Sequence, residues 1–191
     1  MTVIDFVSNV KRIMDLQEGN DTDSLVLFYL NEVRRQYSRL SCYAEFLVNG
    51  ATITMGAANP GYVLPADVNK IVDGSVTYTD NLNPNNIRML VKQDDLLIKP
   101  DGLPIYWKRV GQSIYLAPNT MIADGDILTF SYYQIPADLT LNLAIMPEPN
   151  LTDLWMEATL AKLSRTLDTN RYRLFSSEER EAFKESRAAQ D

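Results

Sequence analysis

Apolar residues recur every three or four positions through the first part of the chain, the spacing that places them on one face of a helix. Over residues 2–17 they are Val3, Phe6, Val7, Val10, Ile13 and Met14. Gly19-Asn20-Asp21 ends this predicted helix, and a longer one is expected from about residue 21 to 47. Its apolar stripe consists of Val26, Leu30, Val33, Tyr37, Leu40, Ala44 and Leu47. Such a stripe needs an apolar partner, and both its own core and a neighbouring subunit remain open alternatives.

After Asn49 the pattern changes to short alternating runs broken by Gly, Pro, Asn and Asp, which is typical of β-strands and turns. Both faces of the last run, from Ile127 to Ile135, are apolar enough to be covered. Val110-Gly111-Gln112-Ser113 predicts a tight hairpin. The strands are expected near Thr52–Met55, Tyr62–Leu64, Ile71–Tyr78, Ile87–Val91, Ile105–Val110, Ser113–Leu116 and Ile127–Ile135.

Helical spacing returns after Pro147-Glu148-Pro149 and predicts a helix that ends near Leu167, followed by a charged final helix from about Arg171. We therefore predict an α+β fold in which N- and C-terminal helices form a helical bundle with an inserted small antiparallel β-barrel or sandwich. The bundle comprises residues 1–48 and 150–191 and the β domain comprises residues 49–149. No apolar run is long enough to span a membrane, and the first residues lack the order of a secretion signal, so a soluble protein made in the cytoplasm is expected.

Composition argues against an enzyme, because the 191 residues include no histidine, the commonest general base and metal ligand. The lone cysteine, Cys42, lies in the apolar stripe and is expected to be a buried thiol. Two acidic pairs, Asp94-Asp95 and Asp124-x-Asp126, could in principle serve carboxylate chemistry. Both lie at turn signals, where an aspartate usually accepts hydrogen bonds from the backbone. We predict no catalytic residue, cofactor or metal.

Charge argues against a general DNA or RNA binder, which would normally be basic, since 25 acidic against 18 basic residues give a net charge of −7. Arg34, Arg35 and Arg39 cluster, as do Arg171 and Arg173, but each group has acidic neighbours and is interpreted as solvated surface or subunit contact. An acidic protein is nevertheless compatible with a channel through which DNA slides, because a weakly repulsive wall avoids the phosphate contacts that would hold the DNA.

The order and spacing of the β signals resemble the head-to-tail adaptor (connector) proteins of tailed bacteriophages. The resemblance covers most of the chain and rests on the segments Tyr62–Asp67, Gly102–Trp107, Ile114–Pro118 and Tyr132–Pro136, enclosed by helices. It implies a virion structural protein at the head-tail interface: a homo-oligomer, in that family a dodecameric ring, which binds the portal protein and a tail or neck protein. DNA would pass through the lumen without sequence-specific binding.

The resemblance also implies which residues make these contacts. C-terminal residues would dock on the portal, here Arg171, Arg173, Phe183, Lys184, Arg187 and Asp191, and Arg34, Tyr37 and Trp155 would lie in the helical ring interface. Three alternatives stay open: a tail-completion protein, a glycan- or ligand-binding β module that uses Trp107 and the tyrosines, and an enzyme that uses the paired carboxylates.

Overall fold

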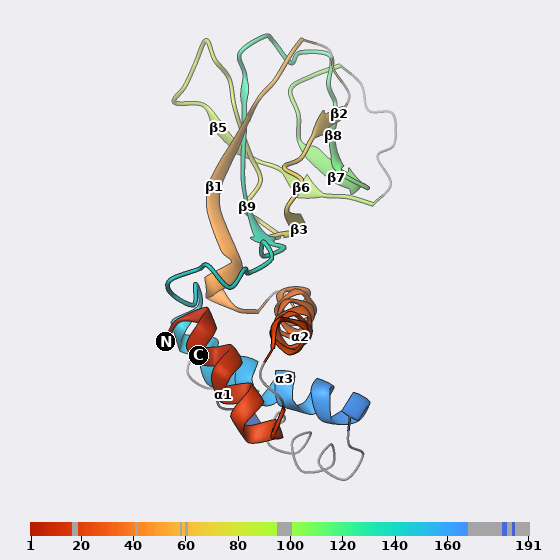
Figure 1. Ribbon diagram of the computed structural model, residues 1–191. Helices are drawn as coiled ribbons and strands as arrows, with labels where there is room; N and C mark the ends of the chain where they lie inside the picture. The colour runs from red at the N-terminus through yellow and green to blue at the C-terminus, as the bar shows by residue number, and fades with distance from the viewer. Residues whose placement is uncertain are drawn as a thin grey trace. The chain divides into compact units, whose positions relative to one another are not determined.

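A computed structural model of the chain describes residues 1–16, 19–40, 42–57, 59, 61–94, 101–167, 181, 182 and 185. Contacts divide the chain into a helical unit, Met1–Glu45 with Pro136–Asp191, and a β unit, Phe46–Ile135 (Figure 1). The sequence-based boundaries were 48/49 and 149/150. The second division lies earlier in the structure because the segment after Pro136 bonds to the helices: Asn31 donates to the carbonyl of Leu139 (3.1 Å) and accepts from its N–H (2.7 Å).

The described part of the helical unit contains α1 (Val3–Met14), α2 (Asn20–Ser38) and α3 (Thr152–Leu167), each in contact with the other two. Thr2 caps α1 by accepting a hydrogen bond from the Asp5 N–H at 3.0 Å, and the Asp5 carboxylate accepts the Thr2 N–H at 3.0 Å. This reciprocal pair lowers the pKa of the Asp5 carboxyl. Val3, Phe6, Val7, Val10 and Met14 are buried, as the spacing predicted, whereas Ile13, placed on the same face by that spacing, is exposed.

Helix α2 ends at Ser38, so the prediction of a helix to residue 47 was wrong. The Ser38 hydroxyl donates to the carbonyl of Arg35 (2.9 Å), and the Leu40 N–H donates to the carbonyl of Tyr37 (3.0 Å), contacts that tighten and close the last turn. A 3₁₀ turn, η1 (Ala44–Phe46), follows. Cys42 therefore lies beyond the helix, and it is half-buried where a fully buried thiol was predicted.

The described part of the β unit contains two sheets (Figure 1). The first has the order β1 (Leu47–Thr54), β9 (Ile127–Gln134), β4 (Thr77–Thr79) and β5 (Ile87–Met89), and β3 (Val68–Ile71) also pairs with β9. The second has the order β2 (Gly61–Val63), β8 (Ser113–Ala117), β7 (Tyr106–Val110) and β6 (Val91–Lys92). The predicted hairpin is present, with Val110 opposite Ser113 across a turn in which Gly111 has a φ of 59°.

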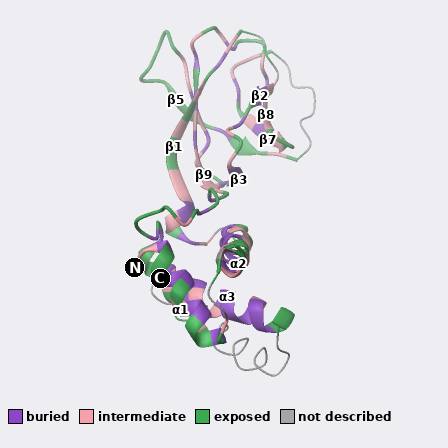
Figure 2. Ribbon diagram, in the orientation of Figure 1, coloured by how far each residue is buried: buried purple, intermediate pink, exposed green. Residues whose placement is uncertain are grey.

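Side chains from both sheets form one apolar cluster. Figure 2 colours the buried positions along the strands purple. No pairing among the described strands joins one sheet to the other, so of the two predicted alternatives, a barrel or a sandwich, the barrel is not formed. The pairing of β6 with β7 is parallel, which corrects the expectation of a wholly antiparallel domain. The cluster consists of Met55, Tyr62, Leu64, Val68, Ile71, Val76, Tyr78, Leu90, Trp107, Ile114, Leu116, Ile122, Leu128, Phe130 and Tyr132.

Three strand predictions need correction. The segment predicted as one strand, Ile87–Val91, is divided between β5 of the first sheet and β6 of the second. The segment predicted as one strand, Ile71–Tyr78, is interrupted between β3 and β4, where Gly74 adopts a φ of 79°. On β9 the alternation is as predicted, with Leu128 and Phe130 buried. However, Ile127 on the opposite face is exposed, so that face is not fully covered.

Candidate interaction surface

Arg34 is the most completely bonded charged side chain on α2. Its Nε and Nη2 donate to the two carboxylate oxygens of Glu148 at 2.9 and 2.5 Å, and its Nη1 donates to the carbonyl of Ala137 at 2.8 Å. Arg34 is 3% exposed and Glu148 5% exposed. The two-point geometry satisfies a charge pair that would otherwise be costly to bury. Arg34 thus fastens α2 to the chain that leads into α3, and its interpretation as solvated surface is wrong.

Tyr37 and Trp155 form an aromatic contact between α2 and α3. Their ring centroids are 5.6 Å apart and the ring planes meet at 72°, an edge-to-face arrangement. Trp155 is fully buried and Tyr37 nearly so. Tyr43 continues the contact, with its centroid 6.3 Å from that of Tyr37.

Arg34, Tyr37 and Trp155, which were predicted to lie in a subunit interface, therefore make contacts inside the helical unit of a single chain. Their contribution to contacts between copies stays a prediction. The residues predicted to dock on a portal, Arg171, Arg173, Phe183, Lys184, Arg187 and Asp191, lie outside the described residues.

The second acidic pair, Asp124 and Asp126, accepts hydrogen bonds from backbone N–H groups. The buried Asp126 carboxylate accepts from the Tyr78 hydroxyl (2.6 Å), the Asn81 N–H (2.9 Å) and the Ala123 N–H (2.7 Å). Asp124 accepts from the Ala57 N–H at 2.6 Å. Burial, reinforced by the bond to Asp126, raises the pKa of the Tyr78 hydroxyl. Both aspartates thus behave as turn residues, as the sequence indicated.

Asp94 is exposed, and Asp95 lies outside the described residues. Among the residues that the structure describes, no group of three or more acidic or cysteine side chains could hold a metal ion. In the same residues, no helix is long and apolar enough to cross a membrane.

Trp107 is unsuited to stacking on a sugar or a base, because it is 2% exposed and belongs to the core of the β unit. Tyr62, Tyr78 and Tyr132 are buried in the same core. These four aromatic residues therefore cannot provide the stacking surface that the alternative of a glycan-binding module assigned to them.

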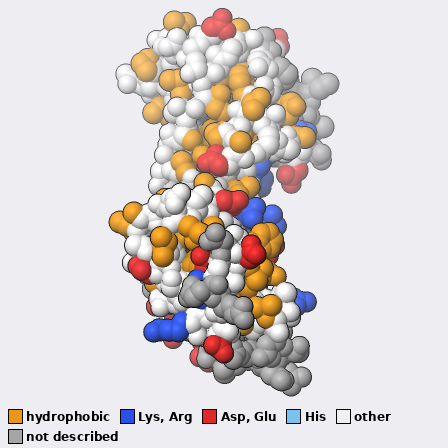
Figure 3. All heavy atoms as spheres, in the orientation of Figure 1, with side chains coloured by type: hydrophobic (Ala, Val, Ile, Leu, Met, Phe, Trp, Pro, Cys, Tyr) orange, Lys and Arg blue, Asp and Glu red, His pale blue; other side chains and the backbone are white. Residues whose placement is uncertain are grey.

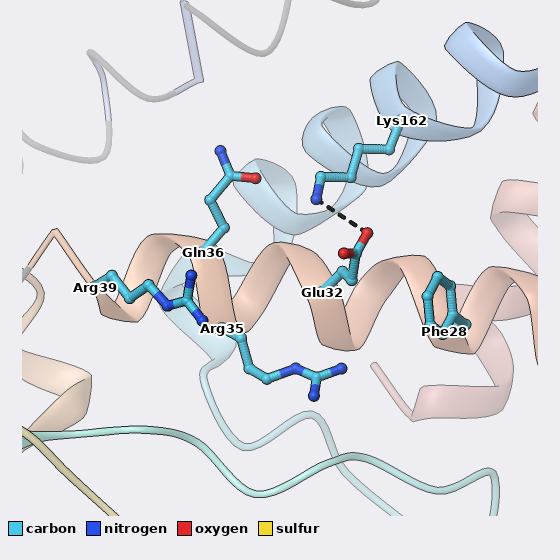
Figure 4. A pocket seen from close by; sticks show the side chains of 6 residues that line it. All are labelled: Phe28, Glu32, Arg35, Gln36, Arg39 and Lys162. Carbon is cyan, nitrogen blue, oxygen red and sulfur yellow. Dashed lines mark hydrogen bonds and ion pairs between the residues drawn. The ribbon is translucent and has the colours of Figure 1, made fainter.

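A pocket of about 450 Å³ lies between α2 and α3 (Figure 4). Lys162 reaches from α3 toward Glu32 on α2, with 3.3 Å between the Nζ and a carboxylate oxygen. Arg35 forms a weaker ion pair with Asp138 at 3.7 Å, in which both side chains are substantially exposed. We call this site the α2–α3 pocket, and the residues that line it are Phe28, Glu32, Arg35, Gln36, Arg39 and Lys162.

Sequence reasoning found only part of this surface. It singled out the Arg34, Arg35 and Arg39 cluster, but it did not separate the inward residue from the outward ones. It missed Lys162 and Glu32, which are 130 positions apart. A cation on α3 that meets an acid on α2 becomes apparent only when the pairing of the two helices is known.

Comparison with known proteins identifies a family. The model of the SU10 adaptor protein family matches residues 1–191, the whole of the chain. No curated protein matches.

Proposed function

Because the chain belongs to the SU10 adaptor protein family, a family of phage adaptors, we propose that it forms a ring at the head-tail junction of the virion, docks on the portal and joins the capsid to the tail. The observation that carries this proposal is the extent of the match, which includes both the helical unit and the β unit. The proposed function is mechanical, and no bond is made or broken.

The helical unit supports assembly into a ring because it combines a fixed interior with apolar positions on its surface. The bonds of Arg34 and the packing of Trp155 hold the helices together from within. Ile4, Ile13 and Phe28 remain exposed on α1 and α2. Burial of such side chains between identical copies is a usual source of the free energy of oligomerisation.

The distribution of charge supports a channel in which DNA is not held. The net charge is −7, and on the face shown in Figure 3 Lys and Arg side chains lie in small separated groups among acidic and uncharged atoms. Tight binding to DNA requires many simultaneous contacts between cations and phosphates. A wall with few such contacts lets the duplex slide.

The portal-facing segment of this proposal is the C-terminal one, with Arg171, Arg173, Phe183, Lys184, Arg187 and Asp191 as its contacts. The β unit would face the tail or neck protein. Resemblance to the adaptor family supports both assignments. Removal of residues 168–191 should then abolish binding to the portal while α1, α2 and α3 remain folded.

The test is quantitative mass spectrometry of purified phage particles. We expect the chain at a ratio of roughly one to one with the portal subunit, as matched rings require. Its absence from particles would refute the proposal. Its presence in isolated tails, together with its absence from portal complexes, would support the tail-completion alternative instead.

A further inference from the structure

The α2–α3 pocket carries more positive than negative charge. Its charged lining residues are three cations, Arg35, Arg39 and Lys162, and one acid, Glu32, a sum of plus two. When Asp138, which pairs with Arg35, is also counted, the summed charge of the pocket is plus one. In a chain with a net charge of −7, this is a local reversal of sign. A concave site with this charge favours an anionic occupant.

The opposite end of α2 carries the complementary charge. Asp21, in the first turn of α2, is exposed, and so is Asp15, which ends α1 with a φ of 54°. We call these two residues the acidic corner. Asp23, beside them, is already paired with Lys11 at 2.6 Å and is left out.

The helix dipole alone does not explain this arrangement. It favours acids at the start of a helix and bases at its end, which accounts for Asp21 and Arg35. It does not account for Asp15, which belongs to α1, or for Lys162, which enters the pocket from α3. Three helices thus contribute to two oppositely charged surfaces on one unit.

These two surfaces cannot meet within one chain. Asp21 and Arg35 are fourteen residues apart on the same helix, a separation of roughly 21 Å at 1.5 Å per residue. A contact between them must therefore join two copies. Because it joins different surfaces of identical chains, it is a head-to-tail contact, the kind that closes into a ring.

We propose that the α2–α3 pocket of one copy receives the acidic corner of the next copy, with Arg35, Arg39 and Lys162 facing Asp15 and Asp21. The inference rests on the proposed ring and names the surfaces that form it. A DNA duplex is a less suitable occupant, because tight binding of DNA requires many contacts between cations and phosphates and the pocket supplies three cations. Two carboxylate side chains can instead each contact a cation.

The test is a charge swap in the full-length protein. One variant carries Arg35→Glu and Arg39→Glu, a second carries Asp15→Lys and Asp21→Lys, and a third carries all four changes. A matched control, Lys70→Glu with Arg88→Glu, makes the same change in net charge as the first variant at exposed positions of the β unit, outside both surfaces. Incorporation into phage particles is measured as the ratio of each variant to the portal subunit, and thermal melting of each purified variant checks its fold.

We expect each two-residue variant to lose incorporation by at least about tenfold, because like charges then face each other. The four-residue variant should recover most of it, and the control should match the wild type. Loss in the pocket variant alone, without rescue by the swap, would mean that the pocket receives DNA or another partner, and would overturn the assignment of a second copy.

A second measurement covers the case in which a reversed variant fails to fold. Wild-type particles assembled from a mixture of ¹⁴N- and ¹⁵N-labelled chains are treated with a carbodiimide, which joins an amine directly to a carboxylate. Cross-links of mixed label between Lys162 and Asp15 or Asp21 support the contact, and their absence refutes it. Absence of the wild-type chain from particles would instead refute the proposed function itself.

Discussion

Replacement of Glu148 by glutamine tests whether the buried ion pair holds the helical unit together. Arg34 and Glu148 are both at least nine-tenths buried and share two hydrogen bonds. Glutamine keeps the shape and one acceptor but removes the negative charge, and this leaves a buried guanidinium without its counter-ion. Breaking such a pair costs about 3 to 5 kcal/mol. Because the carbonyl of Ala137 still accepts one bond from Arg34, we expect a loss near the lower end, about 3 kcal/mol.

The assay can be confined to one unit because each contains one of the two tryptophans of the chain, Trp155 in the helical unit and Trp107 in the β unit. In a Trp107→Phe background, fluorescence during urea unfolding reports the helical unit. With a slope of about 2 kcal/mol per molar urea, Glu148→Gln should lower the midpoint by about 1.5 M. In a Trp155→Phe background, the transition of Trp107 serves as the control and should move far less.

A midpoint shift below about 0.5 M in the helical unit would refute the reasoning, because it would correspond to about 1 kcal/mol, the worth of an ordinary hydrogen bond. The double variant Arg34→Met with Glu148→Leu provides a second criterion. When both charges are replaced by apolar groups of similar volume, most of the stability should return. A double variant as unstable as Glu148→Gln would show that geometry matters at this site and the unpaired charge does not.

Three further outcomes follow from single contacts. Asp126→Ala should destabilise the β unit by about 2 to 4 kcal/mol in urea unfolding, since three donors lose their acceptor. The raised pKa of Tyr78 predicts that stability holds below about pH 10 and declines above it, and urea titrations should show that Tyr78→Phe flattens this decline. Gly111→Ala should cost about 1 to 2 kcal/mol in thermal unfolding, because Gly111 has a φ of 59°, whereas Gly111→Asn should cost less.

Local signals in the sequence were sufficient for the elements whose determinants are local. The hairpin at Gly111 and the alternation on β9 were predicted because a two-residue turn and a period of two are properties of neighbouring residues. The barrel alternative was wrong for the opposite reason, because whether two sheets join depends on pairings between distant strands. The parallel contact of Val91 with Tyr106, within the second sheet, was likewise not predicted. No short pattern in the chain encodes that contact.

The end of α2 shows a second limit. Leu40, Ala44 and Leu47 continue the apolar spacing past Ser38, so periodicity alone favours a longer helix. The helix ends because side-chain and backbone bonds tighten its last turn, and Leu40 is left half-exposed. A serine in this position is compatible with either outcome, and only the surrounding structure determines which occurs.

The arginines at the end of α2 serve both the stability of one copy and the proposed contact between copies. Neighbouring helix residues point about 100° apart, so Arg34 and Arg35 cannot face the same way. Arg34 turns inward to Glu148 and stabilises the unit, while Arg35 and Arg39 turn outward and line the α2–α3 pocket. Loss of the inward pair should therefore lower stability, whereas reversal of the outward pair should lower assembly at unchanged stability. A variant set that separated these two effects would show that one helix both fixes the fold of a copy and binds it to the next.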